Sequence, residues 1–196
     1  MKTVEFFFDF GSPYSYLAST QVEAVAERAG SRLIWRPFLL GAVFQETGNT
    51  SPVLNPCKAR YMVKDLLDWT RRYGLPDLTL PTPFPGNSLL SCRLALVAQE
   101  QGKLPPFAHS LYRQIFAHGE DRSDRGVLAR VLTGVELDPE FCFRRAEEAE
   151  IKQLLRKNTS EAVERGAFGA PTFFVGDDMY VGNDRLMFVE QALCSP

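Results

Sequence analysis

Ser12 stands where the sequence most clearly offers chemistry, at the junction of an aromatic strand and a helix. Residues 4–10 are almost wholly apolar, Gly11 interrupts this run, and the pair Ser12-Pro13 is typical of a helix start. The first backbone N–H groups of a helix have no partner within it, and the helix dipole adds partial positive charge. An anion is favoured there, and the pKa of a thiol placed there falls. These residues therefore predict either a site that stabilises a thiolate or a plain helix cap.

A second candidate segment, GAFGAPT at residues 166–172, leads into an expected strand. Its glycines allow sharp turns, and Pro171 lacks an N–H, which suits the exposed end of a strand. A cis bond before Pro171 would leave the backbone of Ala170 facing outward, where it can pair with an extended ligand. The alternative is a loop that simply enters a strand.

Two further groups of polar residues are ambiguous when each is taken alone. In the segment 182–185, Asn183 or Asp184 can cap the last helix, and Asp184 can also accept a hydrogen bond from a ligand ammonium group. Asn49 and Lys58 flank a polar loop, where a lysine is usually solvated.

The strands that must position these residues are short and aromatic. They are expected at residues 4–10, 32–38, 172–175 and 179–181, with a hairpin turn at residues 176–178. One helix is expected between the first two strands, from Ser12-Pro13 to Gly30. A crossover of this kind implies that these two strands are parallel.

Helices fill the middle of the chain, where the sequence indicates no strand between residues 57 and 157. They are expected at residues 59–73, 88–101, 105–118, 125–132 and 139–157, with a last helix at residues 184–193. Residues 40–56, rich in Gly, Asn, Thr, Ser and Pro, predict a long irregular loop. Neither end of the chain makes an adequate sheet alone. We therefore expect one α/β domain formed by residues 1–55 and 158–196, with an inserted helical domain at residues 56–157.

The composition excludes several classes of function. The 196 residues, 45% of them hydrophobic and 23% charged, are ordinary for a globular protein. A net charge of −2 gives no support for nucleic acid or membrane as a partner, and no apolar run approaches the ~20 residues of a spanning helix. The N-terminus shows no signal-peptide pattern, so we expect a cytoplasmic protein. The four cysteines form no CxxC pair and the two histidines are too few for a metal centre, so we expect no metal site and no dithiol redox site.

In combination, these segments resemble the family of 2-hydroxychromene-2-carboxylate isomerases and kappa-class glutathione transferases. The matching stretches are FFFDFGSPYSYLA (6–18), WRPFLLGAVFQETGN (35–49), KARYM (58–62), GAFGAPTFFV (166–175) and GNDRL (182–186). The resemblance implies an α/β, thioredoxin-like (DsbA-like) fold with a large all-helical insertion. It also implies a homodimer that uses glutathione as a cofactor, takes a small aromatic substrate and acts in the catabolism of aromatic compounds.

The resemblance also implies a role for each candidate residue. Ser12 matches the active-site serine that hydrogen-bonds the glutathione sulfur, and glutathione supplies the thiol because the segment Ser12-Pro13-Tyr14-Ser15 replaces the CxxC of redox relatives. Pro171 matches the cis-proline, and Ala170 the residue whose backbone pairs with the cysteinyl unit. The remaining matches are Asn183 and Asp184 at the γ-glutamyl end, and Asn49 and Lys58 near the glycyl carboxylate. Gly11 departs from the family, where a larger residue such as leucine is expected.

Three functions remain open at this point. The family resemblance favours a glutathione-dependent cis–trans isomerase in which a thiolate adds reversibly to an unsaturated aromatic acid. The alternatives are a kappa-like glutathione transferase or peroxidase, and a glutathione- or peptide-binding module without catalysis. For the aromatic substrate, the candidate lining residues are Arg36, Phe38, Phe44, Phe84 and Asn87.

Overall fold

A computed structural model of the protein describes residues 1–195. The two ends of the chain form a four-stranded sheet with the order β2-β1-β3-β4. The strands are β1 (Thr3–Phe8), β2 (Arg32–Pro37), β3 (Thr172–Val175) and β4 (Asp178–Val181). The pairing of β1 with β2 is parallel, as predicted, and the other two pairings are antiparallel.

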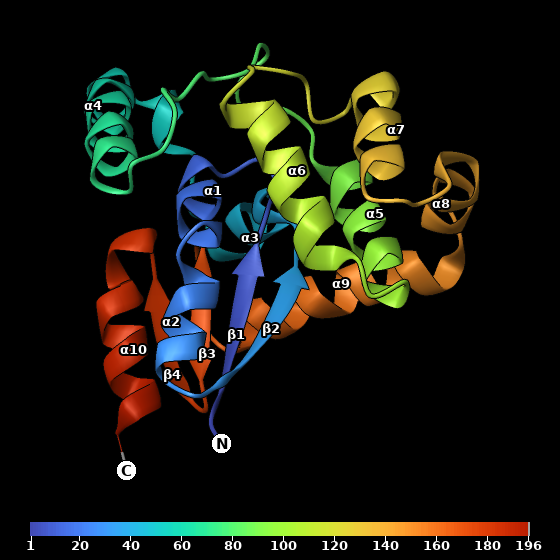
Figure 1. Ribbon diagram of the computed structural model, residues 1–196. Helices are drawn as coiled ribbons and strands as arrows, with labels where there is room; N and C mark the ends of the chain where they lie inside the picture. Colours follow the sequence, from blue (N-terminus) through green and yellow to red (C-terminus); the bar gives the residue numbers. More distant parts are fainter. Residues whose placement is uncertain (196) are drawn as a thin grey trace.

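Helices form the rest of the molecule, and α4–α8 lie between β2 and the return of the chain to the sheet. The helices are α1 (Pro13–Ser19), α2 (Val22–Arg28), α3 (Leu40–Thr47), α4 (Pro56–Arg72), α5 (Leu89–Glu100), α6 (Leu104–Phe116), α7 (Arg125–Gly134), α8 (Pro139–Ala146), α9 (Ala149–Glu164) and α10 (Leu186–Cys194), with short 3₁₀ turns η1 (Pro52–Leu54) and η2 (Asn183–Arg185). In Figure 1, α4 lies above α1 and apart from α5–α8, and α9 leads back to the sheet. No helix within residues 1–195 is long and apolar enough to cross a membrane.

The boundary of the expected helical domain falls within a continuous helix. Residues 157 and 158 both belong to α9, which contacts β2 and α3. The division into residues 1–55 with 158–196 and residues 56–157 stays a prediction, and Pro196 lies outside the described residues.

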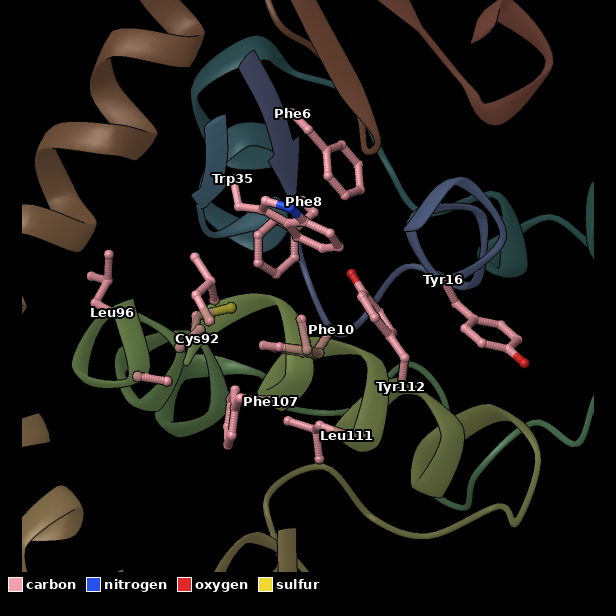
Figure 2. Close-up of a cluster of buried hydrophobic side chains, with 14 of the residues drawn as sticks. Phe6, Phe8, Phe10, Tyr16, Trp35, Cys92, Leu96, Phe107, Leu111 and Tyr112 are labelled. Carbon is pink, nitrogen blue, oxygen red and sulfur yellow. The ribbon is translucent and has the colours of Figure 1, made fainter. Parts of the chain in front are cut away.

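The sheet is covered on both faces because β1 presents phenylalanine to each of them. Phe6 and Phe8 face the larger core, where Phe6 stacks on Phe173 at 5.2 Å between ring centroids and meets the edge of Trp35 at 5.0 Å. Figure 2 shows this aromatic cluster continuing through Phe10 and Tyr112 toward the helical part of the chain. On the other face, Phe7 packs with residues of α3 and α9. The apolar run at residues 4–10 is therefore explained by a strand that is buried on both faces.

The prediction of an irregular loop at residues 40–56 is wrong for the first half of this segment, which forms helix α3. The Leu40 N–H donates to Asp9 Oδ2 at 2.7 Å and so satisfies one unpaired group of the first turn. Val43 is fully buried, and Gly48, with φ of 70°, ends the helix in a left-handed conformation. The glycine- and serine-rich composition belongs to the segment after this helix.

Two of the predicted helices are interrupted. The helix expected from Ser12 to Gly30 breaks between Ser19 and Val22, where the hydroxyl groups of Ser19 and Thr20 donate to the carbonyls of Tyr16 and Leu17 at 2.7 and 2.8 Å. Such side-chain bonds compete with the helical backbone. The helix expected at residues 139–157 is likewise two helices, α8 and α9.

The aromatic packing around Phe6 yields a prediction about stability. Phe6→Ala should lower the free energy of unfolding by about 3–5 kcal/mol, because it leaves a cavity among three fully packed rings. Phe141→Ala is the matched control, since Phe141 is 41% exposed on α8, and it should change stability by no more than about 0.5 kcal/mol. Urea unfolding monitored by circular dichroism measures both, and equal losses would contradict the assignment of the core.

Candidate functional site

A cavity of about 840 Å³ opens where the first turn of α1, the segment before β3 and helix α4 meet. All the site residues predicted from the sequence, except Pro171, line this cavity: Ser12, Asn49, Lys58, Ala170, Asn183 and Asp184. Pro171 lies next to it and is buried. The structure thus brings together residues that are separated by up to about 170 positions in the chain.

Ser12 is the N-cap of α1, and its side chain forms two hydrogen bonds. The Oγ atom accepts a hydrogen bond from the Ser15 N–H at 3.1 Å and donates one to the Ala170 carbonyl at 2.9 Å. The side chain is buried, and Pro13 occupies the first helical position, as the sequence predicts. The Ser12 carbonyl accepts from the Tyr16 N–H, while the Tyr14 N–H has no acceptor within residues 1–195. The first turn of α1 therefore offers one unpaired donor beside a hydroxyl group.

Ala170 and Pro171 supply polar backbone groups at the same place. The Ala170-Pro171 bond is cis, and the Pro171 carbonyl accepts from the Gly182 N–H at 2.9 Å. The Ala170 N–H has no acceptor in the described part of the chain. Ala170 thus carries both a free N–H and a carbonyl whose donor is the Ser12 hydroxyl.

Asn183 and Asp184 lie on η2 and do not cap α10, so the capping alternative is wrong. Arg185 holds the N-cap position of α10 without a side-chain bond. Asn183 is buried and donates from Nδ2 to the hydroxyl of Tyr73, at the end of α4, at 3.4 Å. Asp184 folds back over Gly182, where a Cβ atom would lie 2.4 Å from Oδ1, so this position requires glycine.

Asn49 and Lys58 also line the cavity, and both are exposed. Asn49 joins the end of α3 to the segment before β3, because its Nδ2 donates to the Phe168 carbonyl at 2.8 Å. The ammonium group of Lys58 forms no ion pair within residues 1–195 and is available to an anionic ligand.

One face of α4 lines the cavity, and of its residues only Lys58 is among the candidates predicted from the sequence. The other residues on this face are Tyr61, Met62, Asp65 and Trp69. The hydroxyl of Tyr14 donates to Asp65 Oδ2 at 2.8 Å, and burial together with this carboxylate raises the pKa of Tyr14. The sequence does contain a signal for this face of α4. The lining residues follow Lys58 at helical spacing, which places them on one side of the helix.

Two of the five residues suggested for an aromatic substrate line the cavity, namely Phe44 and Phe84. Arg36 instead pairs with Glu5 and Glu161 at 2.7 and 2.6 Å, and Phe38 is fully buried against Phe7. Asn87 is exposed, and its Oδ1 accepts from the Leu89 N–H at 2.9 Å at the start of α5. These three suggestions are therefore wrong.

Asp9 is a further cavity residue, in addition to the candidates predicted from the sequence. Its carboxylate accepts from the backbone N–H groups of Gly11 at 2.6 Å and Leu40 at 2.7 Å, and so fixes the turn before Ser12 to the start of α3. Burial raises the pKa of Asp9 above its ordinary value, against the effects of the Ser88 side chain, of these backbone hydrogen bonds and of the charge on Arg122.

Comparison with known proteins places the whole chain in one group. The DSBA-like thioredoxin domain family matches residues 3–194. A 2-hydroxychromene-2-carboxylate isomerase from Sphingobium xenophagum is 34% identical over 98% of each chain, and the glutathione S-transferase kappa 2 of Caenorhabditis elegans is 30% identical over 100% of this chain and 93% of that protein.

Solved structures agree with this similarity. The structure of a 2-hydroxychromene-2-carboxylate isomerase superposes with a TM-score of 0.89 at 27% identity, covering 97% of this chain and 94% of that one. A probable DsbA oxidoreductase from Streptomyces coelicolor has a TM-score of 0.77 at 21% identity, covering 98% and 88% of the chains, and shows the fold alone.

The raised pKa of Asp9 predicts how stability depends on pH. The folded protein keeps the Asp9 proton at pH values above 3.8, where the unfolded chain has lost it, so this group's contribution to stability is lost as the pH rises through its folded-state pKa. Urea unfolding between about pH 4 and about pH 7 should show that the free energy of unfolding of the wild type falls relative to that of Asp9→Asn as the pH rises. Asp177→Asn, in the exposed hairpin turn, should follow the wild-type profile. Parallel profiles for wild type and Asp9→Asn would refute the prediction.

Proposed function

Because this chain belongs to the DSBA-like thioredoxin family and, within it, to the group of 2-hydroxychromene-2-carboxylate isomerases and kappa-class glutathione transferases, we propose that it is a glutathione-dependent cis–trans isomerase of an unsaturated aromatic acid. The observation that carries the proposal is the buried Ser12 hydroxyl beside the unpaired Tyr14 N–H, at the base of a cavity of peptide size. All four cysteines are free and none of them lines the cavity, so a ligand would supply the thiol at Ser12.

The residues around the cavity fit a tripeptide thiol with charges at both ends. Ser12 and the Tyr14 N–H would hold the sulfur, and the backbone of Ala170, next to Pro171, would pair with the cysteinyl unit. Asp184 would accept from the ammonium group of the γ-glutamyl end, with Asn183 beside it. Lys58, together with Asn49, would hold the glycyl carboxylate.

Binding at Ala170 is coupled to the proton of Ser12. A serine hydroxyl has a single proton, and in this structure it is donated to the Ala170 carbonyl. An amide N–H of the ligand that bonds to this carbonyl would replace the serine as its donor. The hydroxyl can then rotate toward the sulfur without leaving a buried carbonyl unpaired, which would otherwise cost free energy.

Glutathione, when bound, supplies a thiolate that adds to a conjugated double bond and leaves again after rotation about the resulting single bond. The chain would contribute two donors, Ser12 Oγ and the Tyr14 N–H, that stabilise the sulfur anion before it adds and again after it leaves. Phe44, Phe84 and Trp69 form the apolar walls that would take the aromatic ring. The expected homodimer, the cytoplasmic location and a role in aromatic catabolism stay predictions.

A glutathione transferase is the second candidate, because the kappa-class relative is nearly as similar as the isomerase. The same donors would activate the thiolate for attack on an electrophile, and the conjugate would leave as product. In that case glutathione is consumed, whereas an isomerase regenerates it.

Counting thiols during turnover separates the two candidates. The purified protein is mixed with a small amount of glutathione and an excess of a cis-benzylidenepyruvate-type acid. We expect many isomerisation events per glutathione and a constant thiol concentration. Loss of thiol with 1-chloro-2,4-dinitrobenzene, without isomerisation, would favour the transferase. Protection by glutathione against unfolding, without turnover of any of these compounds, would indicate a binding module.

Ser12→Ala tests the role of the hydroxyl. Loss of a charge-assisted hydrogen bond should lower kcat/KM at neutral pH roughly 10- to 100-fold, with turnover recovering as the pH rises and ionises the thiol. Asp124→Ala is the matched control, because Asp124 caps α7 in the same way, accepting from the Val127 N–H at 2.9 Å, outside the cavity. Both variants should lose about 1 kcal/mol of stability. An unchanged pH–rate profile for Ser12→Ala would reject the role.

A further inference from the structure

Arg122, between α6 and α7, is a buried cation without a direct counter-ion. Its side chain is 1% exposed, and its nitrogens lie more than 4 Å from every carboxylate oxygen in residues 1–195. Nη1 contacts the Gly86 carbonyl at 3.4 Å, a long hydrogen bond, while Nε and Nη2 have no partner among the described residues. A guanidinium buried in this way is costly for folding, because burial disfavours its charge and its donors have lost water.

The guanidinium lies directly behind the cavity wall. A Cβ atom on Gly86 would lie 3.3 Å from its Nη1, and a Cβ atom on Gly11 would lie 3.6 Å from it. Both glycines line the cavity, and Gly11 is the neighbour of Ser12. The ring of Phe84, another lining residue, has its centre 5.8 Å from the guanidinium carbon. The backbone of the two glycines and the ring of Phe84 therefore lie between this charge and the cavity, and the Asp9 carboxylate lies beside Gly11 as well.

The nearest acidic group does not neutralise this charge by contact. The two oxygens of Asp9 are occupied by the N–H groups of Gly11 and Leu40. Asp121 accepts from the N–H and hydroxyl of Ser123. Burial also raises the pKa of Asp9, which favours its neutral form. Arg122 thus projects positive potential into a cavity wall of low dielectric, where charge is weakly screened.

We propose that Arg122 determines specificity for an acidic substrate, by attracting and orienting the carboxylate of the aromatic acid at the Gly11–Gly86 side of the cavity. This inference rests on the proposed function and adds the residue that would select the acid over its uncharged analogue. Arg122 does not touch the reacting atoms. Its charge acts across the backbone of the two glycines, so the presence of the charge matters more than its hydrogen-bonding geometry.

The test compares benzylidenepyruvate with its methyl ester on the glutathione-loaded protein. Arg122→Met should lower kcat/KM for the acid roughly 10- to 50-fold, as expected for charges ~7 Å apart at an effective dielectric constant of ~20, and leave the ester unchanged. Arg122→Lys keeps the charge and should keep the preference for the acid. Arg125→Met removes the same charge from an exposed position three residues further along and should leave kcat/KM unchanged for both substrates.

Stability separates this role from a purely structural one. Replacing an unpaired buried charge by an apolar side chain of similar size should leave the thermal midpoint of Arg122→Met unchanged or raise it. The proposal would be overturned if Arg122→Met had a lower thermal midpoint and lost kcat/KM equally for acid and ester. A loss of the preference for the acid in Arg122→Lys would also overturn it.

Calorimetry distinguishes failure of this inference from failure of the proposed function. If wild type neither binds glutathione nor isomerises the acid, the proposed function fails. The affinities of wild type and Arg122→Met for acid and ester still decide the role of Arg122. Tighter binding of the acid in wild type alone supports it, and equal affinities for acid and ester, or no binding of the acid, overturn it.

Discussion

The hydrogen bond from the Ser12 hydroxyl to the Ala170 carbonyl joins residues 158 positions apart and defines the centre of the cavity. It exists because β1 and β3 are paired in the same sheet, which brings the turn after β1 next to the segment before β3. Under the proposed function this bond also selects the ligand. A simple thiol could approach the hydroxyl, but only a peptide-like thiol carries the amide that replaces the serine as donor to the carbonyl. The same contact therefore stabilises the free protein and favours a tripeptide cofactor.

The chemistry is divided between the two parts of the chain that meet at the cavity. The sheet-forming ends contribute the small polar groups at Ser12, Ala170 and Asp184, of which the first two are joined by a hydrogen bond. Helix α4 contributes larger side chains, and Leu17, Met62 and Leu66 form a buried contact that fixes it over α1. The residues of α4 that line the cavity can therefore vary separately from the turn at Ser12, apart from Asp65, which accepts from the Tyr14 hydroxyl. This division is consistent with relatives that share the fold and have different names and activities.

Local sequence predicted the parts of the fold and site that depend on local interactions. The aromatic run of β1, the cap at Ser12 and the turn into β3 are each determined by a few neighbouring residues, and they were predicted correctly. Helix α3 was missed because its start depends on Asp9, 31 positions earlier. Arg122 was not singled out because its burial arises from packing against Gly11 and Gly86, which no pattern around residue 122 indicates. The spacing of the residues on α4 indicates that they share one face of a helix, but it does not indicate that this face lines the cavity.

The two buried titratable side chains beside Ser12, Asp9 and Arg122, reflect a compromise between stability and function. Asp9 holds the turn through two backbone hydrogen bonds, and its burial disfavours the ionised form. Arg122 lowers the pKa of Asp9 by its charge, yet two of its own donors stay unpaired. An apolar side chain at position 122 would relieve that cost, so packing alone does not account for an arginine there. A glycine at position 11 fits the same arrangement, because a side chain would meet Asp9 at 3.0 Å and approach Arg122. Gly11 and Arg122 therefore form one structural unit. Because Gly11 has no side chain, the buried charge of Arg122 lies close to the cavity.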